Sequence, residues 1–320
     1  MANTPYDDVF RTLLNDCSAL VLPMLNEVFG EHYTGKEEII FFQNEHFLNQ
    51  QDGTEEKRIT DTFFAVSGIE RKKYHWECES KADRSILARF FEYDAQIALD
   101  SSSIENGMLV IEFPHSAVLV LRGGNSMPDR MRTKIKTPGG EVEYDTEVLK
   151  IQSYSLEELF EKNLLFLLPF YIFNHENELE ACEEKPEMLA KLEKEYKETR
   201  NKLEEMQEKG KIDGFTKCTL MDMSNKVAEH IAAKYVKVKE GVKKIMVGQV
   251  LEYEAKTIRN QGRAEGRLEG RLEGRLEGRL EGIRSVIIQM YRKGFTLSQI
   301  AAATDMEENE IQQIINKEQG

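Results

Sequence analysis

The segment that decides the fold is YHWECESKAD, which runs from Tyr74 to Asp83. Its aromatic residues predict a β-strand, and side chains on a strand point alternately to its two faces. Glu77, Glu79 and Lys81 are therefore expected on one side of this strand. Burying a row of charges is costly unless they pair with opposite charges or hold a metal ion. A solvated face of the sheet is the ordinary explanation of the same spacing.

A second strand-like segment, RITDTFFAVSG, lies just upstream and carries Asp61. A tight connection near Gly68 places the centre of an antiparallel hairpin at about residue 70, so we expect Asp61 opposite Glu79 or diagonal to it. Two carboxylates at so short a distance repel each other. The repulsion is relieved when a cation that prefers oxygen ligands, such as Mg²⁺ or Mn²⁺, lies between them. Such a cation polarises a phosphodiester and lowers the pKa of bound water. A lysine nearby would offset charge on the phosphate.

The composition limits the classes of function that fit this chain. It has 320 residues, with 57 acidic and 43 basic side chains and a net charge of −14. This charge opposes general attraction of nucleic acid, so any DNA contact requires a local basic patch. The scattered cysteines include no Cys-x-x-Cys pair, which indicates a reducing compartment and no zinc site. The first residues do not resemble a secretory signal, and the longest apolar run is about half a membrane span. We therefore expect a cytoplasmic protein with no membrane partner.

Hydrophobic spacing predicts helices and strands in mixed order over the first half of the chain. A first helix is expected over 7–29, where Gly30 ends it, and a second over 84–99, where Asp83 caps its start. A third is expected to begin at a capping box of Ser155 and Glu158 and to run to about Leu167. Strands are expected over 38–47, 59–67, 72–80, 108–121 and 141–152. This order predicts an α/β fold in which helices flank a mixed sheet.

The second half has a different character, and we expect it to be helical. Between Glu176 and Glu208 the chain is dense in Glu and Lys with a thin apolar stripe, which predicts exposed helices or a coiled-coil arm. Gly210 and Gly214 end this segment, and a further helix over 221–253 is expected to break at Gly241. The predicted regions are 1–175, the α/β domain; 176–260, a charged helical region; 261–282, a Gly-Arg-Leu-Glu repeat helix; and 283–320, a small helical tail.

Several segments together resemble the PD-(D/E)xK nuclease superfamily, and within it the recombination-promoting nuclease and transposase family. The resemblance covers about Tyr6 to Asn174. It is carried by YDDVFRTLL, NEHFLNQQDG, RITDTFF, HWECES, RFFEYDAQIAL and YSLEELFEKNLLFLLPFY, in that order. The Gly-x-x-Glu repeat and the short helical tail also look like that family.

The resemblance implies a restriction-endonuclease-like mixed sheet and Mg²⁺- or Mn²⁺-dependent hydrolysis of DNA. In one alignment Asp61 and Glu77 are the metal ligands, and Glu79 stands where relatives often carry glutamine or lysine. In the other, Glu79-Ser80-Lys81 is the acid-x-lysine motif. We favour Asp61 and Glu77, with Glu79 as a third acid or ligand and Lys81 nearby. A carboxylate at position 79 cannot act as a lysine does, so a catalytically inactive relative that binds DNA or self-assembles is the alternative.

The segment PDRMRTKIKTP offers the best local basic patch. If it is extended, alternation places four cations on one face: Arg130, Arg132, Lys134 and Lys136. Cations in such a row are suited to contact DNA phosphates. The alternative is a basic loop that balances nearby acids.

Glycine recurs every four residues from Gly262 to Gly282 in GRAEGRLEGRLEGRLEGRLEG. Each glycine costs a helix about 1 kcal/mol relative to alanine, but small residues allow two helices to approach closely. We therefore expect a homo-oligomer contact or a helical spacer, against the alternative of a tolerated repeat expansion.

The tail resembles a helix-turn-helix, but its acidic residues oppose a DNA-recognition role and favour a packing element: Asp305, Glu307, Glu308 and Glu310.

Overall fold

The computed structural model divides the chain into two compact units, Met1–Ala255 and Lys256–Gly320. It describes residues 5–42, 62–67, 72–81, 85–123 and 127–247, the backbone of 45–49 and 55–59, and residues 287–288, 290–293, 295–304, 306, 311–312 and 315. A search of these described residues finds no helix that is both long and apolar enough to cross a membrane.

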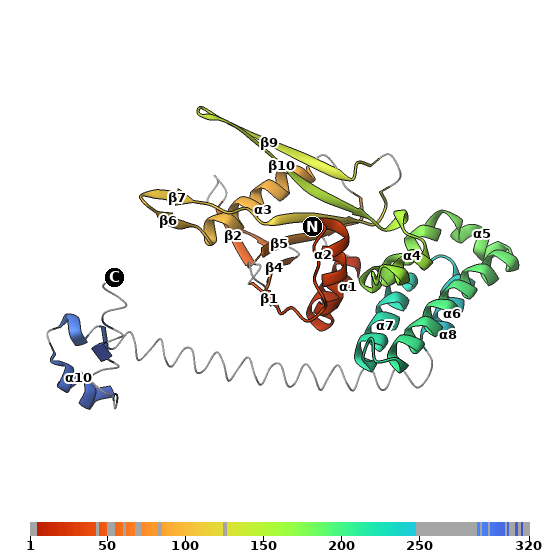
Figure 1. Ribbon diagram of the computed structural model, residues 1–320. Coiled ribbons are helices and arrows are strands. Elements are labelled where there is room, and N and C mark those ends of the chain that lie inside the picture. The colour runs from red at the N-terminus through yellow and green to blue at the C-terminus, as the bar shows by residue number, and fades with distance from the viewer. Residues whose placement is uncertain are drawn as a thin grey trace. The chain divides into compact units, whose positions relative to one another are not determined.

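Six strands form one mixed sheet in the order β1-β4-β5-β8-β10-β9 (Figure 1). Their bounds are Ile39–Phe41 (β1), Thr62–Val66 (β4), Lys72–Glu79 (β5), His115–Val120 (β8), Arg130–Thr137 (β9) and Gly140–Lys150 (β10). β8 lies parallel to both β5 and β10, and the other neighbouring pairs are antiparallel. Parallel neighbours need a long crossover, and the connection from β5 to β8 contains the helix α3, Ile86–Asp100. The predicted α/β fold with a mixed sheet and flanking helices is confirmed.

The N-terminal segment covers one face of the sheet with two helices instead of the single one predicted. These are α1, Pro5–Asp16, and α2, Val21–Phe29, separated by a short 3-10 turn at Ser18–Leu20. Gly30 ends α2 as predicted, with a φ of 68° that favours glycine. Both helices pack against the even-numbered side chains of β5, among them Tyr74 and Trp76, in the main hydrophobic core.

α3 covers the opposite face. Its apolar stripe of Ile86, Phe90, Tyr93 and Ile97 is buried, as the helical spacing over 84–99 requires. Ile86 and Phe90 pack on Val118 and Val120 of β8 in a second core cluster. The predicted cap, Asp83, lies outside the described residues. β5 is thus enclosed on both faces, and its charged side chains must be accommodated inside the protein.

Two separate hairpins accompany the sheet. The predicted strand over 38–47 is divided between β1 and β2, Glu45–Asn49, and β2 pairs with β3, Glu55–Ile59. After α3 the strands β6, Ser103–Glu105, and β7, Met108–Val110, form an exposed hairpin (Figure 1). Its turn residues Asn106 and Gly107 have φ values of 52° and 78°, which is typical of the Asn-Gly turns that close two-residue hairpins.

The segment after β10 enters the core. Ser155 and Glu158 form the predicted capping box of α4, Leu156–Glu161. This helix is shorter than expected, because Asn163 adopts a φ of 56° directly after it and a buried 3-10 helix, η3, follows at Leu165–Glu178. The apolar run LLFLLPFYIF lies within and next to η3 and is part of the main core.

The charged helical region belongs to the first unit. Its helices are α5, Leu179–Glu184, α6, Pro186–Glu208, α7, Gly214–Ile231, and α8, Val236–Met246. The apolar stripe of α6 is buried in or packed against the main core, so α6 is not the exposed arm that its composition predicts: Met188, Leu192, Tyr196, Leu203 and Met206. The predicted break at Gly241 is also wrong. α8 continues through Gly241, and a Cβ there would meet only the flexible side chain of Glu193 on α6, with Oε1 at 2.8 Å.

The described part of the second unit is a small helical element. Its core is formed by five isoleucines: Ile287, Ile288, Ile300, Ile311 and Ile315. Thr296 and Gln299 form a reciprocal cap before α10, Leu297–Thr304. The repeat from Gly262 to Gly282 lies outside the described residues, so its predicted role in self-association stays a prediction.

Candidate functional site

β5 carries the candidate site on the face that α3 covers. His75, Glu77 and Glu79 alternate with the core residues Tyr74, Trp76 and Cys78, as the strand period requires. His75 and Glu77 are buried, with 0% and 5% of their surfaces exposed. Glu79, the last residue of the strand, is partly exposed. The predicted row of acids therefore exists, and it runs from the interior toward the surface.

The register between β4 and β5 agrees with the second of the two expected alternatives. A hairpin with Asp61 directly opposite Glu79 would pair Thr62 with Cys78, whereas Thr62 pairs with Trp76, the two-residue shift that the diagonal alternative requires. A shift of two residues preserves the face on which each side chain lies, so the acids of β5 still project together. Asp61 precedes Thr62 and lies outside the described residues, so its predicted place in the site stays a prediction.

A buried polar cluster stands behind Glu77. His75 Nδ1 lies 2.7 Å from Asp94 Oδ1, and His75 Nε2 lies 3.2 Å from Glu77 Oε1. Ser116 of β8 donates a hydrogen bond of 2.8 Å to the same Asp94 oxygen. Asp94 comes from α3, so three elements meet at the imidazole. The spacing of the acids did not predict this cluster.

The two carboxylates determine the charge of His75. Burial favours the neutral ring, but hydrogen bonds and charge attraction from Asp94 and Glu77 outweigh this effect and raise the pKa of His75 to about 9. The folded protein therefore holds an imidazolium between two acids at neutral pH. Its positive charge lowers the cost of burying Asp94 and Glu77.

Glu79 also has a cationic partner. Arg89 Nη2 on α3 donates to Glu79 Oε1, and both side chains are 18% exposed. Burial raises the pKa of Glu79, the negative charges of Glu77 and Asp7 add to this shift, and Arg89 opposes it. Burial disfavours the charge of Arg89, but the ion pair with Glu79 raises its pKa. α3 thus directs a cation at the strand.

The remaining predicted site residue lies apart from the strand. β5 ends at Glu79, and Lys81 is exposed in the bend that follows. Among the residues that the structure describes, no group of three or more His, Cys, Asp or Glu side chains is arranged to hold a metal ion. Glu77 and Glu79 are the acids of this strand face that could contribute oxygen ligands. Asp94 is fully buried behind them, where Oδ1 contacts His75 and Ser116 and Oδ2 has no hydrogen-bond partner among the described residues.

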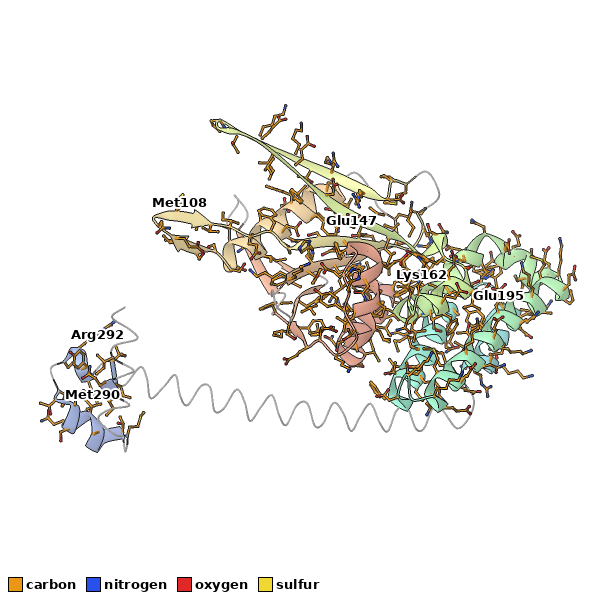
Figure 2. The ribbon with its side chains drawn as sticks, viewed as in Figure 1. Met108, Glu147, Lys162, Glu195, Met290 and Arg292 are labelled. Atoms are coloured by element: carbon orange, nitrogen blue, oxygen red, sulfur yellow. The ribbon has the colours of Figure 1, made fainter. Side chains whose placement is uncertain are left out.

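The predicted basic patch is extended, as the alternation required. Arg130, Arg132, Lys134 and Lys136 lie on the edge strand β9, opposite an acidic row on β10, where side chains such as Glu147 stand out from the ribbon (Figure 2). Arg132 Nε lies 2.7 Å from Asp145, Arg130 lies 3.1 Å from Glu147, and Lys134 pairs with Glu141 and Glu143. We call this double row the β9–β10 charge ladder. It agrees better with the alternative of a balanced segment than with a phosphate-binding surface.

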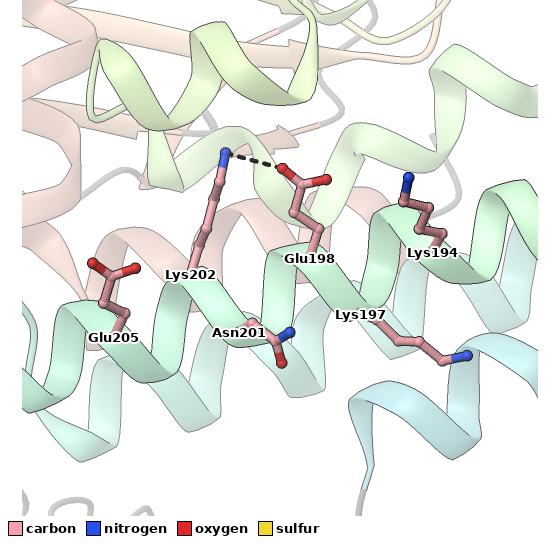
Figure 3. A pocket seen from close by; sticks show the side chains of 6 residues that line it. All are labelled: Lys194, Lys197, Glu198, Asn201, Lys202 and Glu205. Atoms are coloured by element: carbon pink, nitrogen blue, oxygen red, sulfur yellow. Dashed lines mark ion pairs between the residues drawn. The ribbon is translucent and has the colours of Figure 1, made fainter.

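A shallow surface hollow along α6 has a mixed lining of lysines, glutamates and an asparagine (Figure 3). All of these residues come from the solvent-facing side of α6: Lys194, Lys197, Glu198, Asn201, Lys202 and Glu205. Lys202 pairs with Glu198 at 3.2 Å, one turn away. This composition is that of an ordinary solvated helix face, and we assign no chemistry to it.

Comparisons with models of known protein families, with curated proteins and with solved structures find no match for this chain. The assignment of a function therefore rests on the residues themselves and on the resemblance of their motifs.

Proposed function

We propose that this chain is a metal-dependent DNA endonuclease of the PD-(D/E)xK type with a role in recombination or transposition. In this proposal Asp61 and Glu77 hold Mg²⁺ or Mn²⁺ in a cytoplasmic enzyme. The observation that carries it is the burial of Glu77 beside a second carboxylate, Glu79, on one face of a central strand. The mixed sheet with helices on its faces agrees with the restriction-endonuclease-like fold that the motifs imply.

The donor chemistry of this face is suited to such a cation. Glu77 and Glu79 offer hard oxygen ligands, and the charge of Glu77 contributes to the raised pKa of Glu79, after burial. A divalent cation relieves this repulsion. When bound, it would polarise the phosphodiester and lower the pKa of the attacking water.

The protein's own side chains support this chemistry in two ways. His75 holds one oxygen of Glu77 in place, so the ligand is oriented before a cation binds. Arg89 brings a permanently charged guanidinium next to Glu79, where relatives carry glutamine or lysine. A cation at this position can offset charge on the phosphate, a role that Glu79 itself cannot fill.

A catalytically inactive relative, which binds DNA or self-assembles, is the second candidate function. One observation favours it: each described acid of the site already has a cationic neighbour, His75 for Glu77 and Arg89 for Glu79. The charge ladder is likewise balanced, so its cations are not displayed as an unpaired row.

Metal binding and DNA nicking separate the two candidates. We expect the purified chain to bind Mn²⁺ in calorimetry and to nick supercoiled plasmid with Mg²⁺ or Mn²⁺. Asp61→Asn and Glu77→Gln should each lose both properties. Glu143→Gln is the matched control, because it removes a carboxylate from the ladder and not from β5.

The results have distinct meanings. A wild-type protein that neither binds Mn²⁺ nor nicks DNA supports the inactive relative. Equal nicking by wild type, Asp61→Asn and Glu77→Gln identifies a contaminating nuclease and removes the endonuclease proposal.

A further inference from the structure

The described polar side chains that contact Glu77 directly or through His75 are all buried. Asp94 and His75 are 0% exposed, Ser116 is 2% exposed and Glu77 is 5% exposed. The chain of contacts thus begins in the interior, on α3, and ends at the carboxylate nearest the surface. A cluster that served packing alone would be replaceable by apolar side chains of similar volume, often without loss of stability.

The imidazole is held from both sides. His75 Nδ1 lies 2.7 Å from Asp94 Oδ1, and His75 Nε2 lies 3.2 Å from Glu77 Oε1, so each ring nitrogen has a carboxylate within hydrogen-bond distance. Phe90 and Tyr93 of α3 contact the same ring, with centroid distances of 4.9 Å and 5.9 Å. These contacts fix both the position and the rotation of His75, and through Nε2 they constrain Glu77 Oε1.

We propose that Asp94 and His75 form a positioning unit that orients Glu77 for metal binding, an inference that rests on the proposed endonuclease function. Neither residue touches the cation. Asp94 holds the ring, and the ring holds one oxygen of the ligand. Residues that orient metal ligands in this way typically change metal affinity about 10–100-fold when they are replaced.

The spacing of acids along β5 does not predict that Asp94 contacts His75. Asp94 lies 19 residues from His75 in sequence and reaches it only because α3 packs across the strand. His75 shares the strand face of the acids, so the sequence admits a site role for it, but it does not identify its partner.

Calorimetry of Mn²⁺ binding to the full chain, with no DNA present, tests the inference. We expect Asp94→Asn to weaken Mn²⁺ binding about tenfold or more, because the amide keeps the shape of the side chain but replaces the carboxylate that holds the His75 ring at 2.7 Å. Ser116→Ala is the matched control. It removes a hydrogen bond to the same Asp94 oxygen and leaves the His75–Glu77 contact in place, so its Mn²⁺ affinity should stay within about twofold of wild type.

A second measurement on the metal-free protein distinguishes positioning from general stability. The ring signals of His75 in NMR spectra should show the same fixed environment in wild type and in Ser116→Ala, and a changed one in Asp94→Asn. If Asp94→Asn does not fold, His75→Gln takes its place, with the same expected loss of affinity.

Each outcome decides a different question. Weaker binding in a folded Asp94→Asn or His75→Gln, with Ser116→Ala unchanged, supports the positioning unit. Wild-type affinity in those folded variants overturns it and leaves the endonuclease proposal standing. A wild-type chain that binds no Mn²⁺ overturns the endonuclease proposal and the positioning unit together.

Discussion

Two strands of this protein carry charges at every second residue, and the same pattern has opposite consequences in them. In β5 the acids Glu77 and Glu79 follow His75 on a face that α3 encloses. In β9 the cations from Arg130 to Lys136 stand on an edge strand in solvent. The charged side chains of both rows contact groups of opposite charge. On β5 these groups come from α3 and from the strand itself, whereas on β9 they come from the adjacent strand β10.

Burial is what separates the two rows. Exposed ion pairs contribute little to stability, since water already solvates both partners and salt screens them. A buried pair is costly to form and much more costly to break, because removal of one partner leaves an uncompensated charge. Stability is therefore expected to be sensitive to substitution of the buried charged residues on and around β5, and insensitive to substitutions in the β9–β10 charge ladder.

The largest expected effect compares two aspartates that each contact a basic side chain at 2.7 Å. Asp94→Ala removes the partner of His75 and should lower the free energy of unfolding by about 3–5 kcal/mol. Asp145→Ala removes the partner of Arg132 on the exposed ladder and should leave stability nearly unchanged. Urea denaturation of both variants measures the difference. Equal losses would show that burial does not separate the two rows.

A smaller effect concerns the dependence of stability on pH. The pKa of His75 is raised from 6.5 in the unfolded chain to about 9 in the folded protein. Its contribution is therefore fully present below about pH 6.5 and is lost as pH rises through about 9, a difference of about 3 kcal/mol at about 1.4 kcal/mol per pKa unit. The groups that face the ring are Asp94 and Glu77, with Tyr93 from α3.

Denaturation curves between pH 6 and pH 10 test this prediction, with His75→Gln as the reference for all other titrating groups. Wild type should lose more stability than His75→Gln over this interval. Parallel curves would mean that the ring is not charged in the folded protein.

The sequence predicted the individual strands and helices better than the tertiary contacts between them. Alternation identified β5, and helical spacing identified the buried stripe of α3, because both signals are local. The Asn163 conformation that follows α4 depends on tertiary contacts, and so does the continuity of α8 through Gly241, and both were predicted wrongly. A glycine that weakens an isolated helix need not end a helix that tertiary packing supports.

The candidate site was predicted in part for the same reason. Glu77 and Glu79 share a face, as alternation requires, but the period of two cannot show that α3 brings Asp94 and Arg89 to them. Likewise, the four cations of β9 were visible as a row, whereas their pairing with β10 depends on a register that only the hairpin defines. Spacing reports which residues share a face and says little about what lies opposite that face.

The smallest expected effect concerns DNA binding by the exposed β9–β10 charge ladder. Because Arg132 and Lys134 are already paired with Asp145 and Glu143, replacing both cations by glutamine should change DNA affinity little. Removing the acids instead, with Glu143→Gln and Asp145→Asn together, exposes the cations. This variant should bind DNA more tightly, and its affinity should fall more steeply with salt, because additional phosphate contacts release additional counterions. Fluorescence anisotropy over a range of salt concentrations measures both quantities. If the glutamine variant instead loses affinity and salt dependence, the cations of β9 contact DNA in spite of their acidic neighbours, and the ladder is a binding surface rather than a balanced one.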